Sequence, residues 1–195
     1  DPTREWDPYA ETMSYPFAVK PQKKLSVQDV MTMLRGHMEG TPFDMAADKA
    51  WYVREGDNMV KSPLATPFVT KDIRNLLNIP YSRPISKWDC AYSFVSQVRP
   101  GYPAPVRTVL WFGYDNPHTT CYVPIYSGVL ETRESWRTFD RNAFSLNSAQ
   151  WAFILADDLV NRRYQEAMED LKAVRDPLEQ GFAKQVLETD KKALE

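Results

Sequence analysis

The stretch AYSFVSQVRPGYPAPVRTVLWFGYDNPHTTCYVPIYSGVL, residues 91–130, decides the fold class of this chain. Within it, aromatic and β-branched residues recur with a period of two, which is typical of β-strands. Two segments rich in turn-forming residues interrupt the pattern, at 99–105 and 114–118. Three strands joined by such short turns predict an antiparallel meander. Pro124 has no N–H to donate to a ladder, so its strand is expected at an edge or with a bulge.

A helix is predicted before this sheet, over residues 26–40. Ser26 is a favourable N-cap, Asp29 occupies the position three residues on, and Gly40 lies near the expected end. Apolar residues follow the spacing of one buried helical face along this segment. A second, shorter helix is expected at 71–77, inside a section that is otherwise irregular and broken by prolines.

Two further helices are predicted after the sheet. The first should begin at the N-cap Asn147, with Gln150 at the capping-box position. The second should begin at Asp176 and Pro177, since proline suits the first turn of a helix. Helices that precede and follow an antiparallel meander predict an α+β fold in which the helices cover the sheet.

Length and composition fit one domain, or one large fragment of a domain, over residues 1–195. The chain is 43% hydrophobic, and its 24 basic and 26 acidic residues are interspersed. We therefore expect neither nucleic acid nor a membrane as its partner. The N-terminus lacks an initiator methionine and a signal peptide, which predicts a processed or excised chain. The compartment is left open, with the cytoplasm favoured.

The small number of histidines and cysteines, two of each, limits the catalytic sites that the chain could carry. No HExxH or CxxC motif is present, so neither a metal nor another cofactor is expected. His118 and Cys121 are three residues apart on a predicted strand and should face opposite ways, which argues against a Cys–His pair. Cys121 is instead expected to be a core side chain, on the face of Val123 and Ile125.

The remaining titratable groups have structural interpretations. His37 is expected on the helix of residues 26–40, facing away from Cys121, as a solvated or a helix-end histidine. Cys90 and Cys121 could form a disulfide or remain two reduced thiols, and the sequence favours the thiols. The carboxylate pairs at 157–158 and 169–170 are expected on solvated helix faces. From the residues alone, the chain is an α+β domain without a complete catalytic set.

Several short motifs nevertheless occur together in one order. They are LSVQDVM (25–31), EGTPFD (39–44), RPIS (83–86), YSFVSQVRP (92–100), VLWFG (109–113), CYVPIYSGV (121–129), SAQWAF (148–153) and AVRDPLE (173–179). Over residues 15–185 this series resembles the dipeptidase A and secernin-like cysteine peptidases, a family of N-terminal-nucleophile hydrolases. The resemblance implies a four-layer αββα sandwich and the hydrolysis of dipeptides. It also implies a cysteine nucleophile, exposed by processing, whose own α-amino group is the base.

The resemblance places that nucleophile upstream of Asp1, so this chain is expected to be the later part of the enzyme and inactive by itself. Its partners would be the dipeptide substrate and the upstream half, and an uncovered apolar sheet edge predicts self-association. Arg83, which opens RPIS, is the predicted active-site arginine; the alternative is an arginine paired with a surface carboxylate. The sequence after GTPFD departs from the family pattern, so the resemblance assigns no substrate contacts there. A non-catalytic binding module with the same fold is the alternative function.

Overall fold

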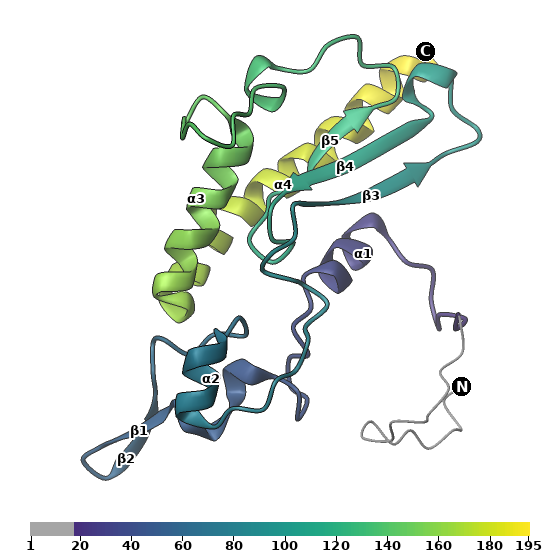
Figure 1. Ribbon diagram of the computed structural model, residues 1–195. Helices are drawn as coiled ribbons and strands as arrows, with labels where there is room; N and C mark the ends of the chain where they lie inside the picture. Colours follow the sequence, from purple (N-terminus) through teal and green to yellow (C-terminus); the bar gives the residue numbers. More distant parts are fainter. Residues whose placement is uncertain (1–17) are drawn as a thin grey trace.

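The computed structural model describes residues 18–195, and a three-stranded antiparallel sheet lies at its centre (Figure 1). The strands β3 (Tyr92–Val98), β4 (Thr108–Tyr114) and β5 (Val123–Tyr126) lie in the order β3-β4-β5. This arrangement confirms the predicted meander. Pro124 lies in β5, which is an edge strand among the described residues. Its missing N–H is tolerated there because an edge strand pairs on one side only.

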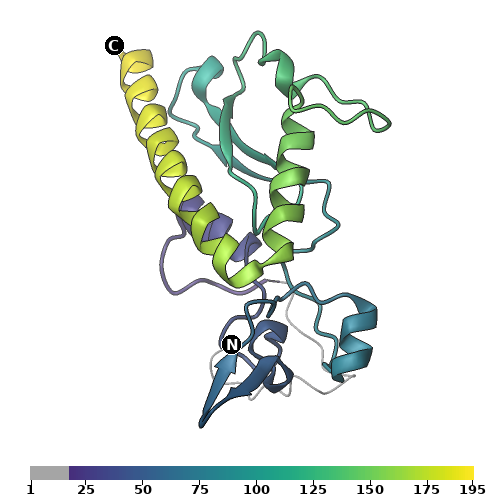
Figure 2. The ribbon, with the colours of Figure 1, turned by 90° about the vertical axis from the view of Figure 1, so that its left-hand side faces the viewer.

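Helices α1 (Val27–Leu34) and α4 (Tyr164–Leu194) cover one face of this sheet (Figures 1 and 2). Alternate side chains of the strands meet the apolar stripe of α1 and the middle of α4 there. The buried members of this main core are Met31, Val95, Val109, Trp111, Tyr122 and Val186. Burial of side chains of this size supplies most of the favourable free energy of folding.

The opposite face of the sheet is covered only in part by the described residues. Helix α3 (Ala149–Arg162) lies on that side (Figure 2), and its Phe153 meets Tyr114 with ring centroids 6.2 Å apart. The short 3-10 helix Glu134–Trp136 adds one aromatic ring beside α3. Farther along the sheet, Tyr92 and Phe94 of β3 expose 53% and 51% of their surface. An apolar face therefore remains open on the β3 side.

Residues 41–80 form a small lobe beside this body, at the lower left of Figure 1. It contains 3-10 turns at Met45–Ala47 and Lys49–Trp51, the hairpin β1 (Tyr52–Glu55) and β2 (Asn58–Lys61), and α2 (Lys71–Leu77). The helix predicted at 71–77 is thus confirmed. The lobe has its own core, formed by Met45, Trp51, Ala65, Val69 and Ile79. A further 3-10 helix, Ala104–Val106, lies between β3 and β4.

Helix α1 begins as predicted but ends earlier. Ser26 and Asp29 form a reciprocal capping box at its start. The expected end at Gly40 is wrong, since the helix stops at Leu34. The carbonyl of Gly36 accepts the N–H of Ser86 at 2.9 Å, a tertiary bond that replaces the next helical one.

The boundaries of the last two helices also differ from the prediction. Ser148, not Asn147, caps α3 by accepting the N–H of Trp151. The chain breaks at Arg163, with φ −144°, and Pro177 lies inside α4. A proline inside a helix removes one hydrogen bond. Hydrogen bonds to the β4–β5 connection on both sides of this proline, from Arg175 to the carbonyl of His118 and from the N–H of Tyr122 to Glu179, help to hold the helix continuous.

The structure thus has mixed helices and antiparallel sheets, which confirms the α+β class. It contains one three-stranded sheet and one isolated hairpin among residues 18–195, so the four-layer sandwich is not confirmed here. None of the helices within this range is long and apolar enough to cross a bilayer.

Candidate active site at the β4–β5 connection

Residues 115–122 connect β4 to β5, and most of their polar side chains are buried. Asp115 begins the connection with φ 66°, a left-handed conformation that Asp tolerates better than most residues. The buried polar members are Asn116, His118, Thr119 and Thr120, which expose between 0% and 6%. Buried polar loops require internal hydrogen-bond partners. Such loops are also frequent positions for functional groups.

A buried hydrogen-bond network joins this connection to two distant segments. Ser86 of the RPIS motif donates to Asn116 Oδ1 at 2.6 Å. The amide of Asn116 donates to Asp157 of α3 at 3.2 Å, and Thr119 donates to the same carboxylate oxygen at 2.7 Å. Asn161 binds its other oxygen at 2.9 Å. Asp157 is 6% exposed, so its predicted place on a solvated face is wrong.

Asp115 lies next to this network, and the ionisation of its carboxyl group is strongly altered. Burial, and then the nearby carboxylates of Asp157 and Asp158, raise the pKa of Asp115 to about 7. Burial also raises the pKa of Asp157, against the hydrogen bonds that it accepts. A carboxyl group that titrates near neutral pH at the end of a strand is a candidate for acid–base chemistry.

The only two histidines of the chain meet beside the same connection. Their ring centroids are 5.1 Å apart, and both approach the hydroxyl of Tyr164, His118 Nε2 at 2.6 Å and His37 Nε2 at 3.5 Å. His118 Nδ1 lies 2.9 Å from the carbonyl oxygen of Arg35. His37 lies two residues after the C-cap of α1 and exposes only 11% of its side chain, so the solvated alternative is wrong, whereas a position close to a helix end agrees with the structure.

Cys121 is a poor candidate for a nucleophile. It lies just before β5 rather than within it, and it is half-buried, so its predicted position in the strand core is corrected. Burial, and then the carboxylate of Glu179, raise the pKa of the Cys121 thiol to about 11. The thiolate is the reactive form, and it is therefore scarce at neutral pH. Both Cys90 and Cys121 are free thiols, which agrees with the favoured alternative.

Arg83 is exposed, three residues before the buried Ser86. The hydrogen bond from Lys87 lowers the pKa of Asp89, and the positive charge of Arg83 adds to this effect. Arg83 thus lies near a surface carboxylate with its guanidinium accessible to solvent. Its role in the active site stays a prediction.

The comparison with protein families decides where the chain belongs. The family model of Peptidase family C69 matches residues 1–176. The chain belongs to this family. The resemblance drawn from the eight short motifs is thereby confirmed.

Two curated relatives of this C69 member are dipeptidases by name. A probable dipeptidase of Latilactobacillus sakei is 26% identical over 141 residues, which cover 72% of this chain and 24% of the relative. Dipeptidase A of Lactobacillus helveticus is 24% identical over 149 residues, covering 76% of this chain and 26% of the relative. The chain thus spans about a quarter of the length of the curated relatives that it matches.

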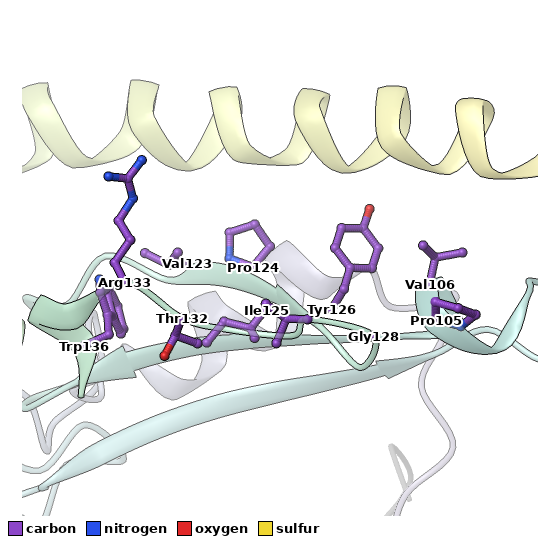
Figure 3. A pocket seen from close by; sticks show the side chains of 11 residues that line it. Pro105, Val106, Val123, Pro124, Ile125, Tyr126, Gly128, Thr132, Arg133 and Trp136 are labelled. Carbon is purple, nitrogen blue, oxygen red and sulfur yellow. The ribbon is translucent and has the colours of Figure 1, made fainter.

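Two cavities of this C69 chain lie on either side of its core. An apolar pocket of about 410 Å³ follows β5, with Trp136 at one end and Pro105 and Val106 at the other (Figure 3). Among the described residues that line it, Arg133 is the only charged one. A more polar cavity of about 680 Å³ lies between α1 and α4. It contains the ion pair of Arg35 with Glu179, and no three side chains of residues 18–195 are arranged to hold a metal.

Sequence reasoning missed the groups that the structure gathers here. Asp115 and Asn116 were assigned only to a turn, and Asp157 to a solvated helix face. A weak signal was present, because the connection contains a polar run, Asp115 to Thr120, between two apolar strands. Its burial depends on α3 and on Ser86, which local periodicity cannot locate.

Proposed function

We propose that this chain is a portion of a cysteine dipeptidase whose nucleophile is an N-terminal cysteine located upstream of it. The observation that carries the proposal is the match of Peptidase family C69 over residues 1–176. The names of the two curated relatives support dipeptides as the substrate. The raised pKa of the Cys121 thiol also supports a nucleophile outside the described residues.

In the proposed reaction, the α-amino group of the upstream cysteine takes the proton of its thiol, and the sulfur attacks the peptide carbonyl. The tetrahedral intermediate collapses to a thioester, and the protonated amine supplies the proton to the leaving amino group. Water then hydrolyses the thioester with the amine again acting as base. Arg83 is proposed to hold the carboxylate of the dipeptide or to stabilise the developing negative charge, through bidentate hydrogen bonds.

The open face of the sheet supports a role as one part of a larger enzyme. Tyr92 and Phe94 are half-exposed, and β3 presents seven residues with one unpaired edge within the described chain. Long uncharged edges and apolar faces of this kind normally pair with further structure. We infer that the rest of the enzyme covers them, as in a four-layer sandwich, and that the isolated chain associates with itself.

Kinetics of the complete enzyme test this proposal. The isolated 195-residue chain should not hydrolyse dipeptides, whereas the complete enzyme should, with sensitivity to thiol alkylation. Arg83→Lys should lower kcat/KM at least tenfold, about 1.4 kcal/mol, with little change in Tm. Arg54→Lys in the exposed hairpin is the matched control, and it should change neither kcat/KM nor Tm. Thiol-dependent turnover by the isolated chain would contradict the proposal.

A binding module without catalysis is the second candidate, and the apolar pocket along β5 favours it. Arg133 is exposed at this pocket and makes no ion pair with the described residues. A hydrophobic carboxylate would place its apolar part against β5 and its charge on Arg133. Octanoate should then change the fluorescence of the isolated chain, through Trp136, more than octanol does. Arg133→Gln should remove this difference, and equal responses to both probes would exclude the carboxylate site.

A further inference from the structure

The lobe of residues 41–80 is joined to the body by few side-chain contacts. Its own core is separate from the core under the sheet. Gln165, at the start of α4, donates to the carbonyl of Ala65 at 2.6 Å. Asp44 lies 3.4 Å from His37 Nδ1, and Phe68 packs beside Tyr164. Elements that share so few contacts can separate at a lower free energy than global unfolding requires.

His118 lies at the centre of this junction in a defined tautomer. The carbonyl oxygen of Arg35 can only accept a hydrogen bond, so His118 Nδ1, 2.9 Å away, must carry the proton. Nε2 of the neutral ring then accepts the hydroxyl proton of Tyr164, at 2.6 Å. Both ring nitrogens are therefore used while the imidazole is neutral. This geometry makes the junction complete in the neutral form of His118.

Phe68 from the lobe closes the site over His118. Its ring centroid lies 5.6 Å from that of His118 and 6.2 Å from that of Tyr164. In this closed arrangement His118 is 5% exposed. Removal of the lobe would take Phe68 away and open the imidazole to water.

The charged groups that face the imidazole also disfavour its protonation. Burial, as the largest effect, and the charges of His37, Arg175 and Lys172 together lower the pKa of His118 to about 4, against the hydrogen bond to the Arg35 carbonyl, which raises it. Arg175 Nη1 donates to the backbone carbonyl of His118 at 2.7 Å. The carboxylates at the junction, Glu39 and Asp44, contact His37 rather than His118, and the charge of Glu39 acts on His118 only as a small opposing effect.

We propose that Phe68, His118 and Tyr164 form an acid-sensitive latch that holds the lobe of residues 41–80 on the body. Closure favours a neutral His118, because Phe68 helps to keep this imidazole from water, whereas the open lobe lets this histidine bind a proton at its ordinary affinity. By linkage, acid therefore favours the open state. The open population should rise up to tenfold per pH unit between about 6.5 and about 4.

The connections of the lobe fit a hinge. Met38 and Gly40 have φ values of 68° and 71° on one side of it, directly after His37. A left-handed conformation is unfavourable for Met, and tertiary contacts must hold it there. On the other side the chain passes through Pro80 and Pro84 before Ser86 anchors it to Asn116. Residues 41–80 lie between these two connections, and we expect them to move as one unit.

Amide hydrogen exchange of the 195-residue chain, corrected for the intrinsic effect of pH, tests the latch. Protection of the amides of α2 and of residues 64–69 should fall about tenfold per pH unit from pH 6.5 to 4.5, while the amides of β4 keep their protection. His118→Gln should remove this pH dependence, and Lys49→Gln, on the lobe surface, should retain it. Equal loss of protection in α2 and β4, or an unchanged slope in His118→Gln, would overturn the proposal.

Proton NMR gives a second measurement that does not need the His118 variant to fold. With only two histidines, the ring signals can be assigned with His37→Gln. His118 should titrate below pH 5 in the native chain. In Phe68→Ala, which weakens closure, its midpoint should move up by one pH unit or more. An unmoved midpoint in a folded Phe68→Ala chain would show that the lobe does not control His118.

Discussion

Glu179 of α4 binds Arg35, the C-cap residue of α1, through two hydrogen bonds, Arg35 Nη1 to Oε2 at 3.0 Å and Nη2 to Oε1 at 2.5 Å. The same Oε1 accepts the backbone N–H of Tyr122 at 2.7 Å. Arg35 also donates to the carbonyl of Thr120 at 3.0 Å. One carboxylate and one guanidinium thus join the C-terminal end of α1 and the middle of α4 to the residues that directly precede β5.

Loss of this carboxylate should destabilise the chain strongly, because a mostly buried guanidinium would lose its partner. Both side chains expose only 14% of their surface. We expect Glu179→Ala to lower the free energy of unfolding by about 2–3 kcal/mol in urea titration. Glu188→Ala, an exposed position on the same helix, should stay within about 0.5 kcal/mol of the native value. Equal effects of the two substitutions would contradict the structural role.

The buried contact between Ser86 and Asn116 should be measurable as a coupling. A double-mutant cycle of Ser86→Ala and Asn116→Ala should give an interaction free energy of about 1 kcal/mol. Ser86→Ala leaves Asn116 Oδ1 with the N–H of His118 as a remaining partner, at 3.0 Å. The single substitution of Asn116 should therefore cost more than that of Ser86. Strict additivity of the two effects would mean that the contact contributes nothing.

Asp115 should make the stability of the chain depend on pH. Its folded-state pKa, about 7, lies above the ordinary value of 3.8. The folded chain thus binds this proton more tightly, and the stability so gained is present below pH 3.8 and lost as pH rises to 7. Asp115→Asn, which tolerates the same backbone conformation, should raise the free energy of unfolding by about 1 kcal/mol at pH 8 and leave it unchanged near pH 4. The gain stays at about 1 kcal/mol because solvent screens this partly exposed carboxyl group. Identical changes at both pH values would refute the assignment.

The Cys121 thiol should react as an unactivated cysteine. In a Cys90→Ser background, the rate of alkylation by iodoacetamide should rise about tenfold per pH unit from pH 8 to pH 10, because the pKa is about 11. An activated nucleophile would instead reach a plateau at lower pH. A plateau below pH 9 would reopen Cys121 as a catalytic candidate.

Local sequence patterns predicted the meander, the capping box of α1 and the edge position of Pro124, because these depend on backbone geometry and nearby residues. The helix boundaries predicted beyond residue 160 were wrong, because those boundaries depend on tertiary contacts rather than on nearby residues. The break at Arg163 has no Gly or Pro to signal it. Pro177 is a strong local signal for a start, yet bonds of Arg175 to His118 and of Glu179 to Tyr122 hold the helix through it.

The sequence by itself determined the fold class and, through the order of its motifs, the family. Only the tertiary structure decided which polar groups are buried together. Ser86 and Asn116 lie 30 residues apart, and Asn116 and Asp157 lie 41 apart. Strand and helix periods depend on neighbours a few residues away, whereas burial and altered pKa values depend on whichever distant segments exclude water. The meeting of His37 with His118 has the same origin, since packing of α1, the β4–β5 connection and α4 brings the two rings together.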